Sequence, residues 1–276
     1  MSNPVFERSP YFADPRARRR SGSGSTAATT VSGPQVQDLE QAYAGPSATP
    51  VQTGRMTYDD VIMKSGGLLA VIVTTAAAAW FLFPGNSLVM ITGLIGGLIL
   101  GLVNAFRREP SPALILGYAA FEGLFLGGIS QFFEAAYSGI VLQAVLATFA
   151  TFAATLALFR SGRVRVTPKF TRTVLIAGAG YLLFSLVNLG LMFFGVLDNP
   201  WGLRGATIMG IPLGVVIGVA AVVLAAAFLV MDFDAIKRGV EGGIPARFAW
   251  SAAFGLVVTL VWLYLEFLRL LAILRE

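Results

Sequence analysis

Four acidic residues stand in or directly beside strongly apolar stretches of this sequence, where a charge is costly. Glu122 and Glu266 each interrupt an apolar run, and Asp232 and Asp234 follow another run directly. An ionisable side chain at membrane depth is by default a candidate for ion or proton chemistry. These four acids are therefore the candidate site residues.

Each acid also has a structural interpretation. Oppositely charged residues three or four positions apart lie on one face of a helix and can neutralise each other. Asp234 has this spacing to Lys237 and Arg238, and Glu266 has it to Arg269; Asp232 could pair with the same two basic residues between one and two turns on. Glu122 has no basic residue in its own stretch, so it must be protonated, face water or meet a partner from another helix.

The chain contains no cysteine and no histidine. This excludes disulfides, thiolate chemistry, zinc sites that need histidine and the Ser-His-Asp arrangement. A proton switch would therefore have to use carboxylates. We expect no enzymatic activity and no resident cofactor.

The elements that position the acids are predicted by hydropathy. A soluble domain carries about 25% charged residues, whereas 13% of this chain is charged and 56% is hydrophobic. The apolar residues form stretches of about 20, enough to cross a hydrocarbon core of roughly 30 Å as helices. We predict an all-α membrane protein with seven spans at 64–83, 87–106, 112–133, 137–159, 173–196, 206–231 and 248–274.

Residues 1–55 are rich in Ser, Pro, Gly, Thr and Gln and bury too little to fold alone. We expect a disordered basic tail before a transmembrane domain over 56–276. The arginines within 16–20 could contact anionic lipid or only keep the tail solvated.

Thr57, with two acids in the following turn, predicts a helix start.

Basic residues predict the orientation. One side of the predicted spans receives Arg55, Lys64, Arg107, Arg108, Arg160, Arg163, Arg165, Lys169, Arg172, Lys237, Arg238 and Arg247. The other side receives Arg204 and Arg275. Since short cytoplasmic loops carry the excess of basic residues, we expect a multi-pass protein of the cell membrane with a cytoplasmic N-terminus and an external C-terminus.

Glycines recur every fourth residue in three predicted spans. The sets are Gly93, Gly97 and Gly101, then Gly123 and Gly127, then Gly210, Gly214 and Gly218. Small residues at this spacing let helix backbones approach closely, either within the chain or in a homodimer through the first or third set. Pro212 is expected to kink the sixth span.

The expected partners are the lipid bilayer and another membrane protein, with no nucleic acid.

The ends of the sixth and seventh spans resemble the transmembrane Bax inhibitor motif family. Residues 231–238, Met-Asp-Phe-Asp-Ala-Ile-Lys-Arg, look like the Asp-containing end of its sixth span. Residues 263–274, which begin Leu-Tyr-Leu-Glu, are similar to its Leu-Tyr-Leu-Asp signature in the seventh. The resemblance covers about 56–276, and residues 3–6 and 56–60 look like an actinobacterial branch.

This resemblance implies a central seventh helix surrounded by six others, and a pH-sensitive calcium leak. The implied gate is a pair of acids, Asp232 and Glu266, that share a proton when closed. Two carboxyl groups in contact cannot both ionise cheaply, so higher pH would part the helices. Arg107 or Arg108 could then pair with Asp232. Calcium, the implied transported ion, prefers oxygen ligands.

The spacing of the seventh span departs from the family pattern. From Ala246 to Glu266 a straight helix would rise about 30 Å, which would carry Glu266 far from Asp232. The conflict is eased if residues 246–254 lie along the interface and the span begins near Gly255. Glu266 would then lie about 16 Å deep.

Our leading functional hypothesis is a pH-regulated cation leak, with Glu122 and Asp234 as further positions on the ion path. The first alternative is a non-transporting membrane protein that regulates a partner through its tail or its glycine faces. The second is a secondary transporter for a small solute, which usually carries an internal repeat. No such repeat is evident in the sequence.

Overall fold

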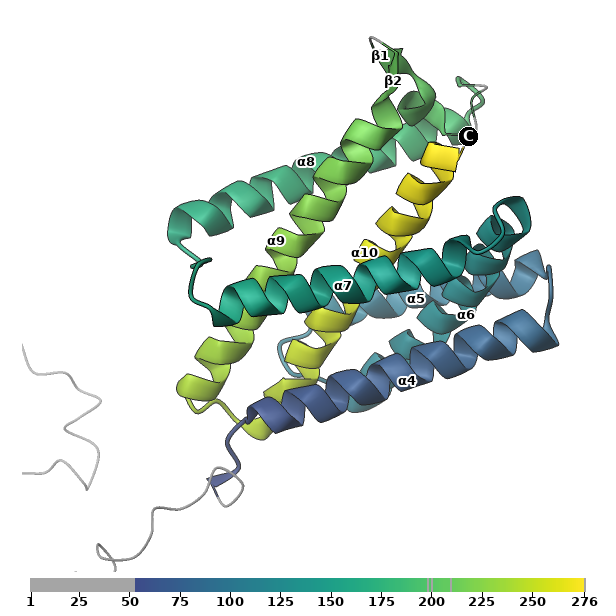
Figure 1. Cartoon of the computed structure of the whole chain (residues 1–276). Coiled ribbons are helices and arrows are strands. Elements are labelled where there is room, and N and C mark those ends of the chain that lie inside the picture. The colour runs from purple at the N-terminus through teal and green to yellow at the C-terminus, as the bar shows by residue number, and fades with distance from the viewer. Residues whose placement is uncertain (1–52, 198, 200, 209, 276) are drawn as a thin grey trace, which may run out of the picture. The chain divides into compact units, whose positions relative to one another are not determined.

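The computed structural model describes residues 53–275 except 198, 200 and 209 (Figure 1). Its long helices are α4 (Tyr58–Leu82), α5 (Ser87–Phe106), α6 (Pro112–Ala136), α7 (Ile140–Arg160), α8 (Pro168–Phe193), α9 (Leu213–Glu241) and α10 (Ala249–Arg275). All seven are long and apolar enough to cross a membrane, so the predicted fold class is confirmed. Most of the predicted tail, 1–52, lies outside the described residues.

Short elements join the last three helices. Two 3-10 helices, η1 (Gly202–Gly205) and η2 (Ala246–Phe248), precede α9 and α10 respectively. Between η1 and α9, β1 (Thr207–Ile208) pairs antiparallel with β2 (Ile211–Pro212). These elements matter because η1 supplies one side chain of the site described below.

The start of α4 follows the prediction from sequence. The Thr57 hydroxyl oxygen accepts the Asp60 N–H at 3.1 Å, and the Asp60 carboxylate accepts the Thr57 N–H at 3.0 Å. This reciprocal capping box satisfies two backbone donors at the helix start. The predicted helix start at Thr57 is therefore confirmed.

Backbone hydrogen bonds fix which helix ends lie together. The Met56 N–H donates to the Ile244 carbonyl and the Ala246 N–H to the Gly54 carbonyl, both at 2.8 Å. They tie the start of α4 to the connection between α9 and α10. We call this end, where α4, α6, α8 and α10 begin, the basic end, because the basic residues of the connecting segments gather here. At the opposite end, the Arg275 guanidinium donates to the Ser138 carbonyl at 2.9 Å.

Helix α10 is the central element. In an apolar stretch of 18 residues within this span, 61% of the residues are buried, against 39% or less in the corresponding stretch of every other span. It contacts α4, α6, α7 and α9 (Figure 1), and Ala249, Ala253, Val257 and Leu263 are fully buried along it. The central seventh helix that the family resemblance implies is present.

Glycines permit the close packing of α4, α5 and α6. A Cβ atom on Gly97 would lie 2.7 Å from the Glu122 carboxylate, and one on Gly127 would lie 2.5 Å from the Ala76 carbonyl oxygen. The glycines that face a neighbouring helix in this way are Gly93, Gly97, Gly123 and Gly127. Packing within the chain therefore accounts for these two sets, and a homodimer through the α5 face stays a prediction.

The third glycine set is not a single helix face. Gly214 and Gly218 lie on α9 and pack against α10, but Gly210 lies in the turn between β1 and β2 with φ +82°. Pro212 precedes the first residue of α9. The predicted kink is therefore wrong, because a proline before the first turn removes no hydrogen bond from the helix. A homodimer through this set also stays a prediction.

We expect Gly123→Ala to destabilise the bundle, because the added Cβ would collide with the Ile72 carbonyl oxygen of α4. Overpacking of this kind costs about 1–3 kcal/mol. Thermal unfolding in detergent micelles should show a lowered midpoint. The control is Gly180→Ala on α8, where a Cβ meets nothing within 4 Å. Equal midpoints for the two variants would contradict the packing argument.

Candidate functional site

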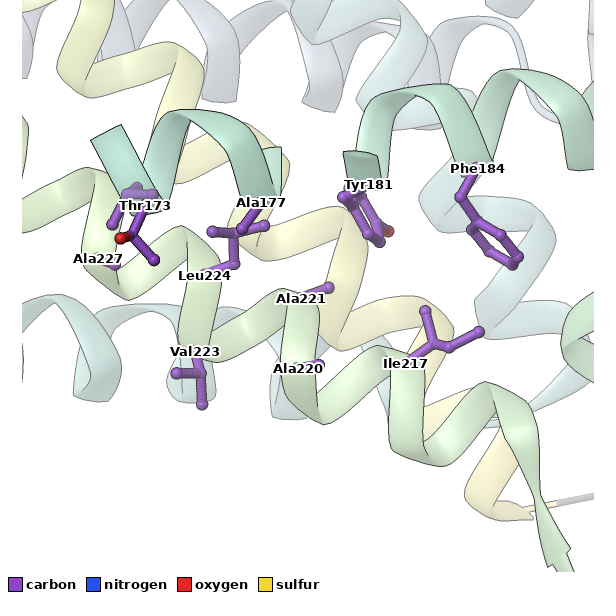
Figure 2. A pocket seen from close by; sticks show the side chains of 11 residues that line it. Thr173, Ala177, Tyr181, Phe184, Ile217, Ala220, Ala221, Val223, Leu224 and Ala227 are labelled. Carbon is purple, nitrogen blue, oxygen red and sulfur yellow. The ribbon is translucent and has the colours of Figure 1, made fainter. Parts of the chain in front are cut away.

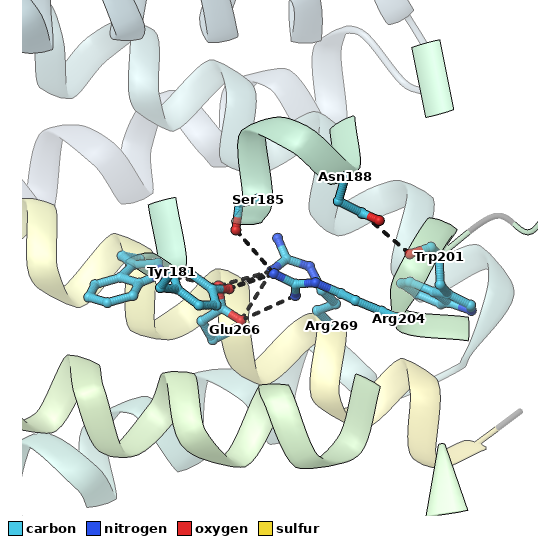
Figure 3. A network of polar contacts seen from close by, with 8 residues as sticks. Tyr181, Ser185, Asn188, Trp201, Arg204, Glu266 and Arg269 are labelled. Carbon is cyan, nitrogen blue, oxygen red and sulfur yellow. Dashed lines mark hydrogen bonds and ion pairs between the residues drawn. The ribbon is translucent and has the colours of Figure 1, made fainter. Parts of the chain in front are cut away.

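A buried polar cluster surrounds Glu266 on α10 (Figure 3). The Glu266 side chain is only 2% exposed. Its Oε1 accepts hydrogen bonds from the Tyr181 hydroxyl, from Trp262 Nε1 at 3.1 Å and from Arg269 Nη1 at 2.9 Å. Its Oε2 accepts from Arg269 Nη1 at 3.1 Å and lies 3.7 Å from Arg204 Nη1. Groups from three elements therefore compensate one buried carboxylate.

Arg204 enters this cluster from η1 and not from a spanning helix. Its side chain is 4% exposed, and its Nη2 donates to the Tyr181 hydroxyl at 2.8 Å and to the Ser185 hydroxyl at 3.2 Å. The guanidinium also lies over the rings of Tyr181 and Phe184, 5.4 and 5.6 Å from their centroids. Arginine suits this position because it combines stacking with several donors.

The segment that carries Arg204 is fixed by Asn188 of α8. The Asn188 side-chain oxygen accepts the Leu203 N–H at 2.7 Å, and its nitrogen donates to the Trp201 carbonyl at 3.4 Å (Figure 3). Gly202 has φ +60°, and a Cβ there would collide with the Asn188 side chain. Glycine is therefore required at the residue where the chain turns inward.

The cluster has a surplus of positive charge. Two guanidinium groups, of Arg204 and Arg269, face one carboxylate, so the formal charge is +1 (2 − 1). The Arg269 side chain is 33% exposed, whereas that of Arg204 is almost fully buried. A surplus cation in a poorly solvated site repels other cations strongly. The cluster can thus act both as a lock between helices and as a barrier to cations.

Asp232 lies elsewhere, where α9 meets the middle of α10. The Thr259 hydroxyl donates to Asp232 Oδ2 at 2.7 Å. The other oxygen, Oδ1, faces Gly255, where even an added Cβ would remain 3.8 Å away. Within the described part of the chain, no basic group lies within ion-pair distance of Asp232. This partly buried carboxylate is thus compensated by one hydroxyl.

The structure does not bring Asp232 and Glu266 together. Thr259, the partner of Asp232, precedes Glu266 by seven positions on α10, which is roughly 10 Å along the helix axis. The hydrogen-bond partners of the two acids have no residue in common. The predicted sharing of a proton is therefore absent from this structure, and a role for either acid in gating stays a prediction.

The reason is the continuity of α10. The helix begins at Ala249, after only three residues of 3-10 helix at Ala246–Phe248. Ala249 and Ala253 are fully buried, so most of 246–254 belongs to the span and does not lie along an interface. The break near Gly255 that would have eased the conflict with the family pattern is therefore absent, and Glu266 lies seven positions further along the continuous α10 than Thr259, the partner of Asp232.

Two of the predicted ion pairs are present. Glu266 pairs with Arg269 as described, and Asp234 pairs with Arg238 at 2.9 Å, whereas Asp232 forms neither of the pairs predicted for it. Lys237 instead pairs with Glu241 at 3.8 Å.

Glu122 and the arginines after α5 remain outside both sites. Glu122 lies against Gly97 at the α5–α6 contact, and no hydrogen bond or ion pair reaches it from the described residues. Arg107 caps the end of α5, and neither it nor Arg108 forms an ion pair with Asp232. Their predicted roles stay predictions.

Tyr181, Ser185 and Arg204 are site residues that the sequence did not single out. The sequence contained one indication of this site: Arg204 is one of only two basic residues on the side of the predicted spans that is poor in basic residues. Among the described residues, no three acidic side chains gather in a way that could hold a metal ion. A cation in that part of the chain would therefore meet fewer than three acidic side chains at any one place.

Two comparisons with known proteins bear on identity. A family model described as Bax inhibitor 1 like matches residues 3–276. No curated protein sequence matches the chain. The family match includes the helices that carry Asp232 and Glu266.

We expect Glu266→Gln to lower the thermal unfolding midpoint strongly, because it leaves two guanidinium groups without a carboxylate. Breaking a buried ion pair costs about 3–5 kcal/mol. The matched control is Glu241→Gln, which removes an exposed pair worth about 0–1 kcal/mol. If both variants unfold at the midpoint of the unmodified protein, the cluster does not stabilise the bundle.

Proposed function

The chain belongs to the Bax inhibitor 1 like family, and on this premise we propose that it is a regulated cation leak with calcium as the transported ion. It is an integral membrane protein with seven candidate spans. One observation carries the proposal: the central helix carries Glu266 and contacts Asp232 at a different depth, and only Glu266 is neutralised by arginine. Asp232 is the proposed cation site and the Glu266 cluster the proposed barrier.

The surroundings of Asp232 suit a transient cation site. Calcium is a hard cation that prefers oxygen ligands, and the Asp232 carboxylate and the Thr259 hydroxyl offer oxygens side by side. Asp232 lies nine positions before the end of α9, about 14 Å from the basic end. Because the positive-inside rule makes that end cytoplasmic, the site would be reached from the cytoplasm.

The Glu266 cluster supports the proposed barrier by its charge. At 5 Å from a net charge of +1, a monovalent cation is disfavoured by about 3 kcal/mol at an effective dielectric constant of 20, and a divalent one by about twice that. The first figure alone lowers occupancy by a factor of about 200. Conduction would then require Arg204 to withdraw from the cluster.

Helix α8 has room for such a movement. It packs mainly on α9 and η1, and between α8 and α9 lies an apolar cavity of about 490 Å³ (Figure 2). Tyr181 and Phe184, the rings that hold Arg204, line this cavity opposite the small residues Ala220 and Ala221. A shift of α8 into the cavity would move Tyr181, and the Arg204 guanidinium bound to it, relative to Glu266.

We expect Asp232→Asn to reduce calcium influx into liposomes that contain the protein by roughly tenfold, the effect of losing about 1.4 kcal/mol of attraction. Influx should rise with pH in the unmodified protein, because only the ionised carboxylate attracts the cation. The Asn variant should lose this pH dependence.

The matched control is Asp234→Asn, two positions away, whose carboxylate is already paired with Arg238. It should retain the pH dependence. Influx that is unchanged in Asp232→Asn would refute the assignment of the cation site, and the absence of any influx in the unmodified protein would favour a regulatory protein that does not transport.

The barrier is tested by Arg204→Gln. We expect calcium influx to rise at least about tenfold, since a surplus charge worth more than 1.4 kcal/mol is removed. Arg275→Gln is the control, because Arg275 lies at the same end of the bundle on exposed hydrogen bonds. Size-exclusion chromatography should first confirm that both variants are folded. Equal influx in the two variants would contradict the barrier.

A further inference from the structure

A groove of about 620 Å³ lies between the start of α8 and the end of α9, at the basic end. Its polar part consists of Thr167, Thr171 and Arg172 from the α8 side and of Asp234 and Arg238 from α9, so two guanidinium groups face one carboxylate. The proposed leak uses none of these side chains. The groove is also separate from the apolar cavity beside Tyr181, which has a different lining.

The charge of the groove favours an anion. Arg238 is paired with Asp234 at 2.9 Å, but Arg172 forms no ion pair within the described part of the chain. The flanking segment adds more positive charge, because residues 160–172 contain five basic residues and no acidic one. An anionic group in the groove would thus meet a net positive surface, with two threonine hydroxyls as further donors.

The groove changes character along α8. Leu175 and Ile176 continue its wall about one turn deeper into the span. They are 50% and 61% exposed, so their side chains are open to the bilayer. The groove is thus positively charged near the membrane surface and apolar below it. A phospholipid has matching parts in the same sequence, with a phosphate at the interface and an acyl chain beneath it.

We propose that this groove is a binding site for an anionic glycerophospholipid. The phosphate lies between Arg172 and Arg238, and one acyl chain follows Leu175 and Ile176. Arginine suits phosphate because its planar donors match the phosphate oxygens. The charge of the groove selects an anionic lipid over a zwitterionic one, since each basic group near the surface contributes independently to the attraction.

The packing of α8 gives such a lipid a structural role. In the apolar stretch of 18 residues within α8, only 11% of the residues are buried. A lipid that touches Arg172 of α8 and Arg238 of α9 would connect these two helices at the basic end, where the groove separates them.

The proposal is tested on the full-length, delipidated protein in a neutral detergent. Phosphatidylglycerol and phosphatidylcholine with identical acyl chains are added in equal amounts, and native mass spectrometry measures the ratio of the bound lipids. The unmodified protein should prefer phosphatidylglycerol. Arg172→Gln should reduce that preference roughly fivefold, the usual effect of one basic group near a lipid surface, and Arg172→Lys should retain most of it.

The matched control is Arg163→Gln, which removes the same charge from the same connecting segment outside the groove. It should leave the preference close to that of the unmodified protein, because a lipid bound in the groove does not contact Arg163 and no charged bilayer surface is present in the neutral detergent. Equal losses in Arg163→Gln and Arg172→Gln would overturn the proposal in favour of diffuse surface charge. No preference for phosphatidylglycerol would overturn it as well, as would full displacement of the lipid by millimolar inorganic phosphate, which would identify a free-phosphate site.

Discussion

The burial of one carboxylate on the central helix is the constraint on which the rest of this structure depends. An uncompensated charge in the low-dielectric interior costs several kcal/mol, so Glu266 can exist at 2% exposure only with donors on every side. The seventh helix itself supplies Trp262 and Arg269. The remaining donors must come from outside it, and this requirement explains why a loop arginine and an α8 tyrosine are drawn into the bundle.

The same requirement accounts for the irregular segment between α8 and α9. A loop at a membrane surface needs no inward arginine, yet this segment turns on Gly202, is anchored by Asn188 and directs Arg204 inward. The segment and α8 therefore act as one unit held by the Glu266 charge. Because α8 has few other contacts within the bundle, a change in that ion pair would be transmitted to the position of α8 before that of any other helix.

Much of the fold could be predicted from sequence, because the forces that define spans are local. Apolar runs, the Thr57 cap and the pairs of Asp234 with Arg238 and of Glu266 with Arg269 depend on neighbours along the chain, and these were found as predicted. The sixth span begins at Leu213, later than predicted, because residues 207–212 form a short hairpin. The Arg204–Glu266 pair could not be predicted, since it joins residues 62 positions apart and depends on how a loop folds back. The Asp232–Glu266 contact was predicted wrongly for a related reason: the family pattern gave the two acids but not their relative depth, which the unbroken α10 determines.

That difference in depth changes what kind of coupling is physically available. Two carboxyls in contact would share a proton, and the titration of one would be felt by the other directly. Across about 10 Å of helix, the direct electrostatic coupling is weaker than between two carboxyls in contact, and the rigid α10 that carries both Thr259 and Glu266 adds a mechanical connection. A change of charge at Asp232 would alter its hydrogen bond with Thr259 and hence the packing of α9 against α10. The Glu266 cluster would be affected mechanically if that change moved α10 relative to Arg204, so the proposed sensing acid and the proposed barrier are separate parts joined by one helix.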